Sequence, residues 1–138
     1  MAQQKRYAPV IGKLRNAGLR PTRQRIALAE LMFRGEDRHI SAEMLHTEAT
    51  EARVSVSLAT VYNTLHQFTQ AGLLREIAVE AGRSYFDTNT SDHHHFYFEG
   101  DGHLEDVASD EVVVTSLPTP PRGAKISRVD VVIRVNED

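Results

Sequence analysis

Apolar residues recur every three to four positions along residues 1–74, and this spacing predicts four short helices. Gly18 and Gly72 follow the first and last of these stretches, where a residue in left-handed conformation commonly ends a helix. Ser41 and Ser57 precede the third and fourth stretches, as N-cap residues do. The fourth stretch has the clearest apolar stripe, which consists of Leu58, Val61, Leu65 and Phe68.

After Leu74 the period of the apolar residues changes from helical to alternating. Ile77 and Val79 alternate with glutamates, and the Ala81-Gly82 turn signal then predicts a β-hairpin. Further strands are expected at 93–98, 104–107 and 129–135. The segment 110–117 is ambiguous between a short helix and a strand.

Helices followed by a hairpin are the element order of a winged helix, and the last third of the chain is rich in strands. We therefore expect an α+β fold in two parts. A winged-helix DNA-binding domain would cover residues 1–88, and a small α/β domain for dimerisation and metal or haem sensing would cover residues 89–138. A unit of about 50 residues buries a low fraction of its surface, so pairing of two copies would help it fold.

The composition narrows the chemistry that this chain can perform. Of its 138 residues 41% are hydrophobic and 25% are charged, which is ordinary globular usage. The chain has no cysteine, so disulfides, thiolate nucleophiles and iron–sulfur clusters are excluded, and a metal site must use His, Asp or Glu. No apolar run is long enough to cross a bilayer, so we expect a cytoplasmic protein without a membrane partner.

Charge is distributed unevenly along the chain. Residues 1–84 hold 12 basic and 8 acidic residues, whereas residues 85–138 hold 4 basic and 11 acidic ones. Seven basic residues and no acidic one lie within residues 1–25, which favours a polyanionic partner, although a solvated helical face is the simpler alternative.

The fourth predicted helix has a polar face without charges, which suits hydrogen bonding to base edges in a major groove. Thr60 and Tyr62 could contact thymine methyl groups, and Asn63 could pair with adenine. Arg20 suits a narrow A/T minor groove, and the other basic residues suit phosphates. The predicted DNA-binding residues are Lys13, Arg15, Arg20, Arg23, Arg25, Ser57, Thr60, Tyr62 and Asn63.

Three consecutive histidines, His93, His94 and His95, lie in the acidic part of the chain. In a strand, His93 and His95 would point to one face and His94 to the other. Two imidazoles with carboxylates can hold a divalent ion, and imidazole can also be an axial ligand of haem iron. Asp87 and Asp106 are the candidate carboxylates. The alternative is a solvated surface loop.

Four motifs together resemble the ferric uptake regulator family across nearly the whole chain. They are Gly-Leu-Arg-Pro-Thr-Arg-Gln-Arg at 18–25, His-Ile-Ser-Ala-Glu at 39–43, Ser-Leu-Ala-Thr-Val-Tyr at 57–62 and the histidines at 93–95. Phe98 and Asp101 stand where the family's Cys-x-x-Cys would follow, so its four-cysteine structural zinc is expected to be absent. A cysteine-free chain with three histidines resembles the iron response regulator branch of alphaproteobacteria.

The resemblance implies a regulator of iron and haem metabolism genes, mainly a repressor, and no catalytic residues. It would be a homodimer or a higher oligomer that binds A/T-rich inverted repeats in double-stranded DNA when iron is scarce, and haem at His93, His94 and His95 would release it. One divalent metal, Fe, Mn or Zn, would bind at a site that the family resemblance assigns to His39, Asp87, His95 and Asp106. The alternative is a repressor with Fe²⁺ or Mn²⁺ as corepressor, and a more distant one is a small metal-dependent hydrolase.

Overall fold

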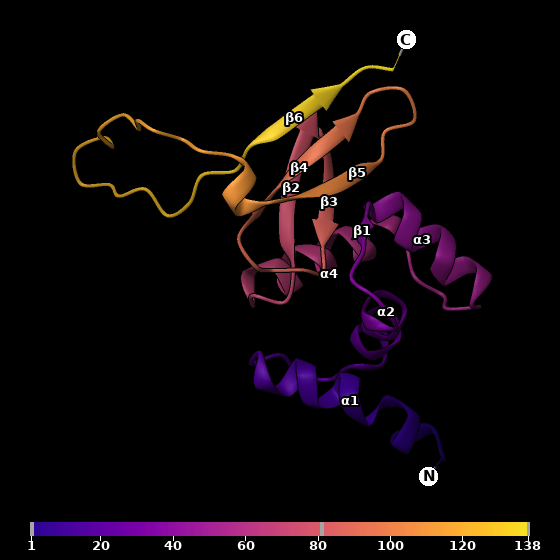
Figure 1. Cartoon of the computed structure of the whole chain (residues 1–138). Coiled ribbons are helices and arrows are strands. Elements are labelled where there is room, and N and C mark those ends of the chain that lie inside the picture. The colour runs from indigo at the N-terminus through magenta and orange to yellow at the C-terminus, as the bar shows by residue number, and fades with distance from the viewer. Residues whose placement is uncertain (1, 81, 138) are drawn as a thin grey trace. The chain divides into compact units, whose positions relative to one another are not determined.

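Four α-helices lie where the apolar spacing predicts them (Figure 1). Thr22, Ser41 and Ser57 begin the last three helices, and each side-chain oxygen accepts a backbone N–H three residues on, at 3.1–3.3 Å. Gly18 and Gly72 follow the first and fourth helices with φ of +80° and +82°, which confirms their left-handed conformation. The helices are α1 (Ala2–Asn16), α2 (Arg23–Phe33), α3 (Ala42–Glu51) and α4 (Leu58–Gln70).

The computed structural model describes residues 2–80 and 82–137, and side chains from Tyr7 onward. Ala81 of the predicted turn and the side chains of Lys5 and Arg6 lie outside the described residues. The chain divides into two compact units, residues 1–90 and 91–138. We call them unit 1 and unit 2.

Unit 1 combines the four helices with a small antiparallel sheet. Its strands are β1 (His39–Ile40), β2 (Arg75–Glu80) and β3 (Arg83–Asp87), in the order β1-β3-β2. The β2–β3 pair is the predicted hairpin. The core that joins helices and sheet consists of fully buried apolar side chains, among them Leu14, Leu28, Met32, Leu45, Leu65, Phe68 and Phe86.

Unit 2 is a three-stranded sheet in the order β5-β4-β6. The central strand β4 (His93–Phe98) pairs antiparallel with β5 (Leu104–Ala108) and parallel with β6 (Val132–Val135). The strands at 93–98 and 104–107 were predicted, whereas β6 begins three residues later than the predicted 129–135. Helices and sheets segregate along the chain, so the protein belongs to the α+β class.

The segment 110–117 is neither the helix nor the strand that the sequence suggested. Only a 3₁₀ turn, η1 (Ser109–Glu111), precedes an irregular stretch. Three consecutive β-branched valines at 112–114 disfavour a helix, and the prolines from Pro118 onward prevent its continuation. The described part of unit 2 therefore has no α-helix, in contrast to the expected α/β domain. No helix in the described ranges 2–80 and 82–137 has the length and hydropathy of a membrane span.

Candidate functional site

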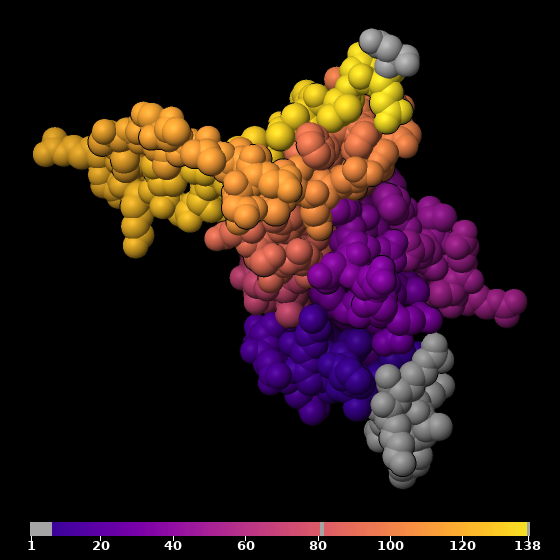
Figure 2. All heavy atoms as spheres, viewed as in Figure 1, coloured from indigo at the N-terminus to yellow at the C-terminus, as the bar shows by residue number. Residues whose placement is uncertain are grey.

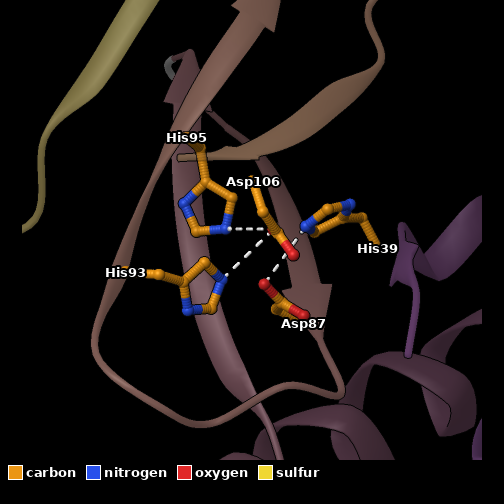
Figure 3. A group of neighbouring side chains, drawn as sticks. All are labelled: His39, Asp87, His93, His95 and Asp106. Atoms are coloured by element: carbon orange, nitrogen blue, oxygen red, sulfur yellow. Dashed lines mark ion pairs between the residues drawn. The ribbon is translucent and has the colours of Figure 1, made fainter. Parts of the chain in front are cut away.

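His93, His95 and Asp106 form a compact donor group on one face of unit 2 (Figure 3). The β4–β5 register places Asp106 directly opposite His95, and His93 lies on the same face because side chains alternate along a strand. Asp106 Oδ1 is 3.2 Å from His93 Nε2 and 3.5 Å from His95 Nε2. Both imidazoles are buried, whereas the Asp106 side chain is 45% exposed.

The tautomer of His93 is fixed by its backbone neighbour. His93 Nδ1 lies 2.6 Å from the carbonyl oxygen of Ser91, which can only accept, so Nδ1 carries the proton and donates it. In the neutral ring the lone pair is then on Nε2, which faces the Asp106 carboxylate. A nitrogen lone pair and a carboxylate oxygen that face each other in this way can hold a metal ion between them. A ring held through Nδ1–H is also how metal-ligating histidines are commonly oriented.

These three residues fit a divalent ion by their chemistry. One ligand atom from each lies within 4.8 Å of the others. Two imidazole nitrogens and one carboxylate oxygen are a donor set that Zn²⁺, Fe²⁺ and Mn²⁺ all accept.

His94 points away from this group, as the alternation predicts. Its Nδ1 accepts the N–H of Val131 at 3.1 Å, which places the ring proton of a neutral His94 on Nε2. An axial haem ligand needs a lone pair at the nitrogen that meets the iron. The three histidines predicted for haem therefore do not converge on one ligand in the described geometry.

His39 and Asp87 form a second donor pair, in unit 1. They are register partners on β1 and β3, and His39 Nε2 lies 3.1 Å from Asp87 Oδ2 (Figure 3). The other carboxylate oxygen of Asp87 accepts the N–H of Asn89 at 2.9 Å. This pair contains two of the four predicted metal ligands. The other two, His95 and Asp106, are in unit 2, where His93 is a third member of the donor group.

A bidentate ion pair fixes the strand that carries His39. Arg38 donates to both carboxylate oxygens of Glu48 on α3, at 2.9 and 2.5 Å. The Arg38 backbone N–H donates to Thr88 Oγ1 at 2.8 Å, and the Thr88 N–H donates to the Arg38 oxygen at 3.1 Å. The residues just before His39 and just after Asp87 are thus bound to each other and to α3. Sequence reasoning missed this arrangement, because Glu48 and Thr88 are 10 and 50 positions from Arg38.

The polar face of α4 is present, but several of its predicted DNA-contacting groups already have partners. The Ser57 hydroxyl donates to Thr60 Oγ1 at 2.9 Å as part of the helix cap. Tyr62 donates its hydroxyl to Glu43 Oε1 on α3 at 2.6 Å, which raises the pKa of Tyr62 and lowers that of Glu43. Asn63 is exposed on the same helix.

The predicted basic residues divide into two groups. Arg15, Arg20 and Arg23 are exposed. Lys13, also exposed, places its Nζ 4.6 Å from the centroid of the Phe33 ring, a cation–π contact between α1 and α2.

Arg25 is used inside unit 1. Its Nε and Nη2 donate to Gln67 Oε1 on α4 at 3.3 and 3.0 Å, and its Nη1 donates to the Arg20 carbonyl oxygen at 3.0 Å. Arg25 therefore positions α4 as well as adding positive charge. Sequence reasoning missed Gln67 as its partner, since the two residues are 42 positions apart.

His103 lies apart from the donor group, in the β4–β5 turn. Its Nδ1 is hydrogen-bonded to Asp101, and the ring stacks on Phe98 with centroids 4.1 Å apart. The hydrogen bond to Asp101 raises the pKa of His103, and the same bond lowers the pKa of Asp101. His103 is thus bound by its neighbours in the turn.

A family model and curated relatives both match this chain to ferric uptake regulators. Residues 16–134 match the model of the ferric uptake regulator family. Two similar curated proteins are the ferric uptake regulation proteins of Cupriavidus metallidurans and Bordetella parapertussis. They are 38% identical over 86 residues and 37% identical over 82 residues, respectively. These matches cover 62% and 59% of this chain and only 60% and 59% of the relatives, so the chain spans less than two thirds of either.

Solved structures align over more of the chain. The ferric uptake regulator of Vibrio cholerae aligns with a TM-score of 0.71 and 25% identity, over 91% of this chain and 98% of that one. The ferric uptake regulator of Pseudomonas aeruginosa, solved with manganese, aligns with a TM-score of 0.69 and 28% identity, over 91% and 96% of the two chains.

Proposed function

Since the chain belongs to the ferric uptake regulator family, we propose that it is a metal-responsive transcription regulator that binds DNA, mainly as a repressor, and is not an enzyme. The observation that carries the proposal is the donor group of unit 2, in which the Nε2 atoms of His93 and His95 face one carboxylate oxygen of Asp106. The relatives are named as regulators, which favours regulation over metal-dependent hydrolysis.

We propose that a divalent ion binds to His93, His95 and Asp106. Three protein donors are fewer than the four of a closed structural zinc site, so the ion has room for further ligands. The predicted further ligands are His39 and Asp87, which are already paired with each other. The ion would supply positive charge to the donor group of unit 2. It has no catalytic task in this proposal.

For DNA we propose that unit 1 acts as a winged helix. The exposed polar face of α4 would lie in the major groove, and the β2–β3 hairpin would lie beside the backbone. The exposed Arg15, Arg20 and Arg23 would contact phosphates or an A/T-rich minor groove. Two copies would join through unit 2, so the operator would be an inverted repeat.

Release of DNA by haem, the prediction that distinguishes the iron response regulator branch, remains a prediction from the resemblance. Burial of His93 and His95 and the tautomer of His94 favour a metal ion over haem at this strand. Haem and metal ions are therefore compared in the same experiment.

That experiment is an operator-binding titration of the full chain without metal, with Mn²⁺ and with haem. We expect Mn²⁺ to change the dissociation constant for an A/T-rich inverted repeat by tenfold or more, because an ion shifts the equilibrium by its differential affinity for the two conformations. An unchanged constant with Mn²⁺ and a large increase with haem would replace the metal proposal by the haem alternative. No binding to the operator under any of the three conditions would refute the regulator proposal.

Replacing Asn63 with alanine should remove base discrimination at one operator position. An asparagine amide that pairs with adenine contributes about 1 to 3 kcal/mol of discrimination. The matched control is Arg15→Ala, which should weaken binding to all sequences similarly and flatten the salt dependence by about one charge. Binding of both variants to a set of single-base operator changes checks this, and an Asn63 variant with intact base preference excludes Asn63 from base recognition.

A further inference from the structure

Residues 112–129 form an arm that extends from unit 2 without helix or strand (Figures 1 and 2, orange to gold). Among the described residues six large hydrophobic side chains are exposed, and four of them are in the arm: Val113, Val114, Leu117 and Ile126. Val113 is the most exposed, at 77%. Loops of this length are uncommon unless they are functional or disordered.

The arm differs in charge from the rest of its unit. It contains Arg122, Lys125 and Arg128 and no acidic residue. The remainder of residues 91–138 contains ten acidic residues and only one basic one. Arg128 is paired with Asp130 at 2.8 Å, whereas Arg122 and Lys125 are exposed. The arm is thus apolar and basic, and the sheet from which it extends is acidic.

One face of that sheet has a complementary character. Phe96 and Phe98 of β4 are register partners of Ile133 and Val135 of β6, so the four side chains share a face. All four are only half-buried in the single chain. Glu105 lies opposite Phe96 on β5 and is exposed on the same face. The face therefore combines a partly exposed apolar centre with an acidic residue, Glu105, at its margin.

We propose that the arm of one copy docks on this face of a second copy, with Val113, Val114 and Leu117 on the aromatic and aliphatic centre and with Arg122 and Lys125 near the acidic margin. The proposal rests on the dimer of the proposed function and names the surface that forms it. Charge complementarity favours a second copy, because the arm carries opposite charge to the sheet. Nucleic acid is the weaker candidate, because four exposed apolar side chains gain nothing from phosphates.

The first test is the dimer dissociation constant of the full chain, measured by sedimentation equilibrium without DNA. Val113→Asp should raise this constant by tenfold or more, because the variant places a carboxylate among apolar side chains and other carboxylates. Thr119→Asp is the matched control, since it adds the same charge at an exposed position of the same arm and should change the constant less than threefold. Val113 is exposed in the single chain, so its replacement leaves the fold intact.

The second test uses the absence of cysteine from the chain. A Val113→Cys chain and a Glu105→Cys chain of different mass are mixed and treated with a short bismaleimide cross-linker. We expect a cross-linked heterodimer. An Ala108→Cys chain in place of Glu105→Cys should give none, because Ala108 is exposed on the opposite face of the same sheet, as the register partner of His93.

Three results would overturn the proposal: equal dimer constants for Val113→Asp and the native chain, no cross-linked heterodimer of the Val113→Cys and Glu105→Cys chains, or loss of DNA binding by Val113→Asp with an unchanged dimer. The last result would assign the arm to nucleic acid. A chain that dimerises through the arm but ignores operator DNA would refute the regulator proposal and leave the arm contact intact.

Discussion

Alanine in place of His95 should lower the affinity of the protein for Mn²⁺ or Zn²⁺ by about 100-fold or more. Loss of a residue that merely orients a metal ligand typically costs 10- to 100-fold, and His95 is proposed as a ligand itself. Its Nε2 is one of three donors that face each other, and the imidazole is buried, so water replaces it poorly. Competition with a chromophoric chelator measures the affinity.

His94→Ala is the matched control for this prediction. It makes the same chemical change in the same strand, but on the opposite face, and should leave metal affinity within about threefold of the native value. If both variants bind metal alike, the donor group of unit 2 is not the metal site. If only His94→Ala loses affinity, the ligand is on the other face of the sheet.

The effect of metal on DNA binding should be lost in His95→Ala and kept in His94→Ala, as for metal affinity. With His95→Ala, operator affinity should no longer respond to Mn²⁺ at concentrations that saturate the native chain, because the ion acts only through its differential affinity for two conformations. Affinity without metal should be unchanged, since His95 is outside the unit that carries α4.

Alanine in place of Phe68 should lower the free energy of unfolding of unit 1 by about 3 to 5 kcal/mol, the usual effect of removing a buried aromatic ring. Phe68 is fully buried on the apolar side of α4, and its ring centroid is 6.2 Å from that of Phe33 on α2. A cavity at this point removes the support of the proposed recognition helix. Urea unfolding followed by far-UV circular dichroism measures the loss.

Gln70→Ala is the control for Phe68→Ala, because Gln70 is exposed on the same helix and the substitution should change stability by less than about 0.5 kcal/mol. A loss below 1 kcal/mol for Phe68→Ala would mean that α4 does not depend on this core. Operator binding by the variant at low temperature, where it remains folded, then separates loss of stability from loss of DNA contacts.

Some of the polar residues predicted to contact DNA form contacts within unit 1 that involve α4. Arg25 and Tyr62 were both predicted to touch DNA, and both are also bound within unit 1, to Gln67 and Glu43. Groups with such partners can orient the helix as well as contact DNA. Residues such as Asn63, which is exposed on the polar face, are the sharper targets for mutation.

The sequence alone determined the features that depend on neighbours a few positions apart. Apolar spacing, the caps at Thr22, Ser41 and Ser57 and the turn glycines fixed the four helices, because these interactions close within one helical turn. Alternation along β4 likewise placed His93 and His95 on one face and His94 on the other.

Only the tertiary structure decided which groups meet across elements. The register of β4 and β5 puts Asp106 opposite His95, and a slip by one residue would put Glu105 or Val107 there instead. The tertiary structure also decided that Arg38 binds Glu48. It decided as well that the valines at 112–114, which have high β-propensity, are not part of a strand. Local pattern cannot specify these outcomes, because strand pairing and side-chain partners depend on residues far apart in sequence.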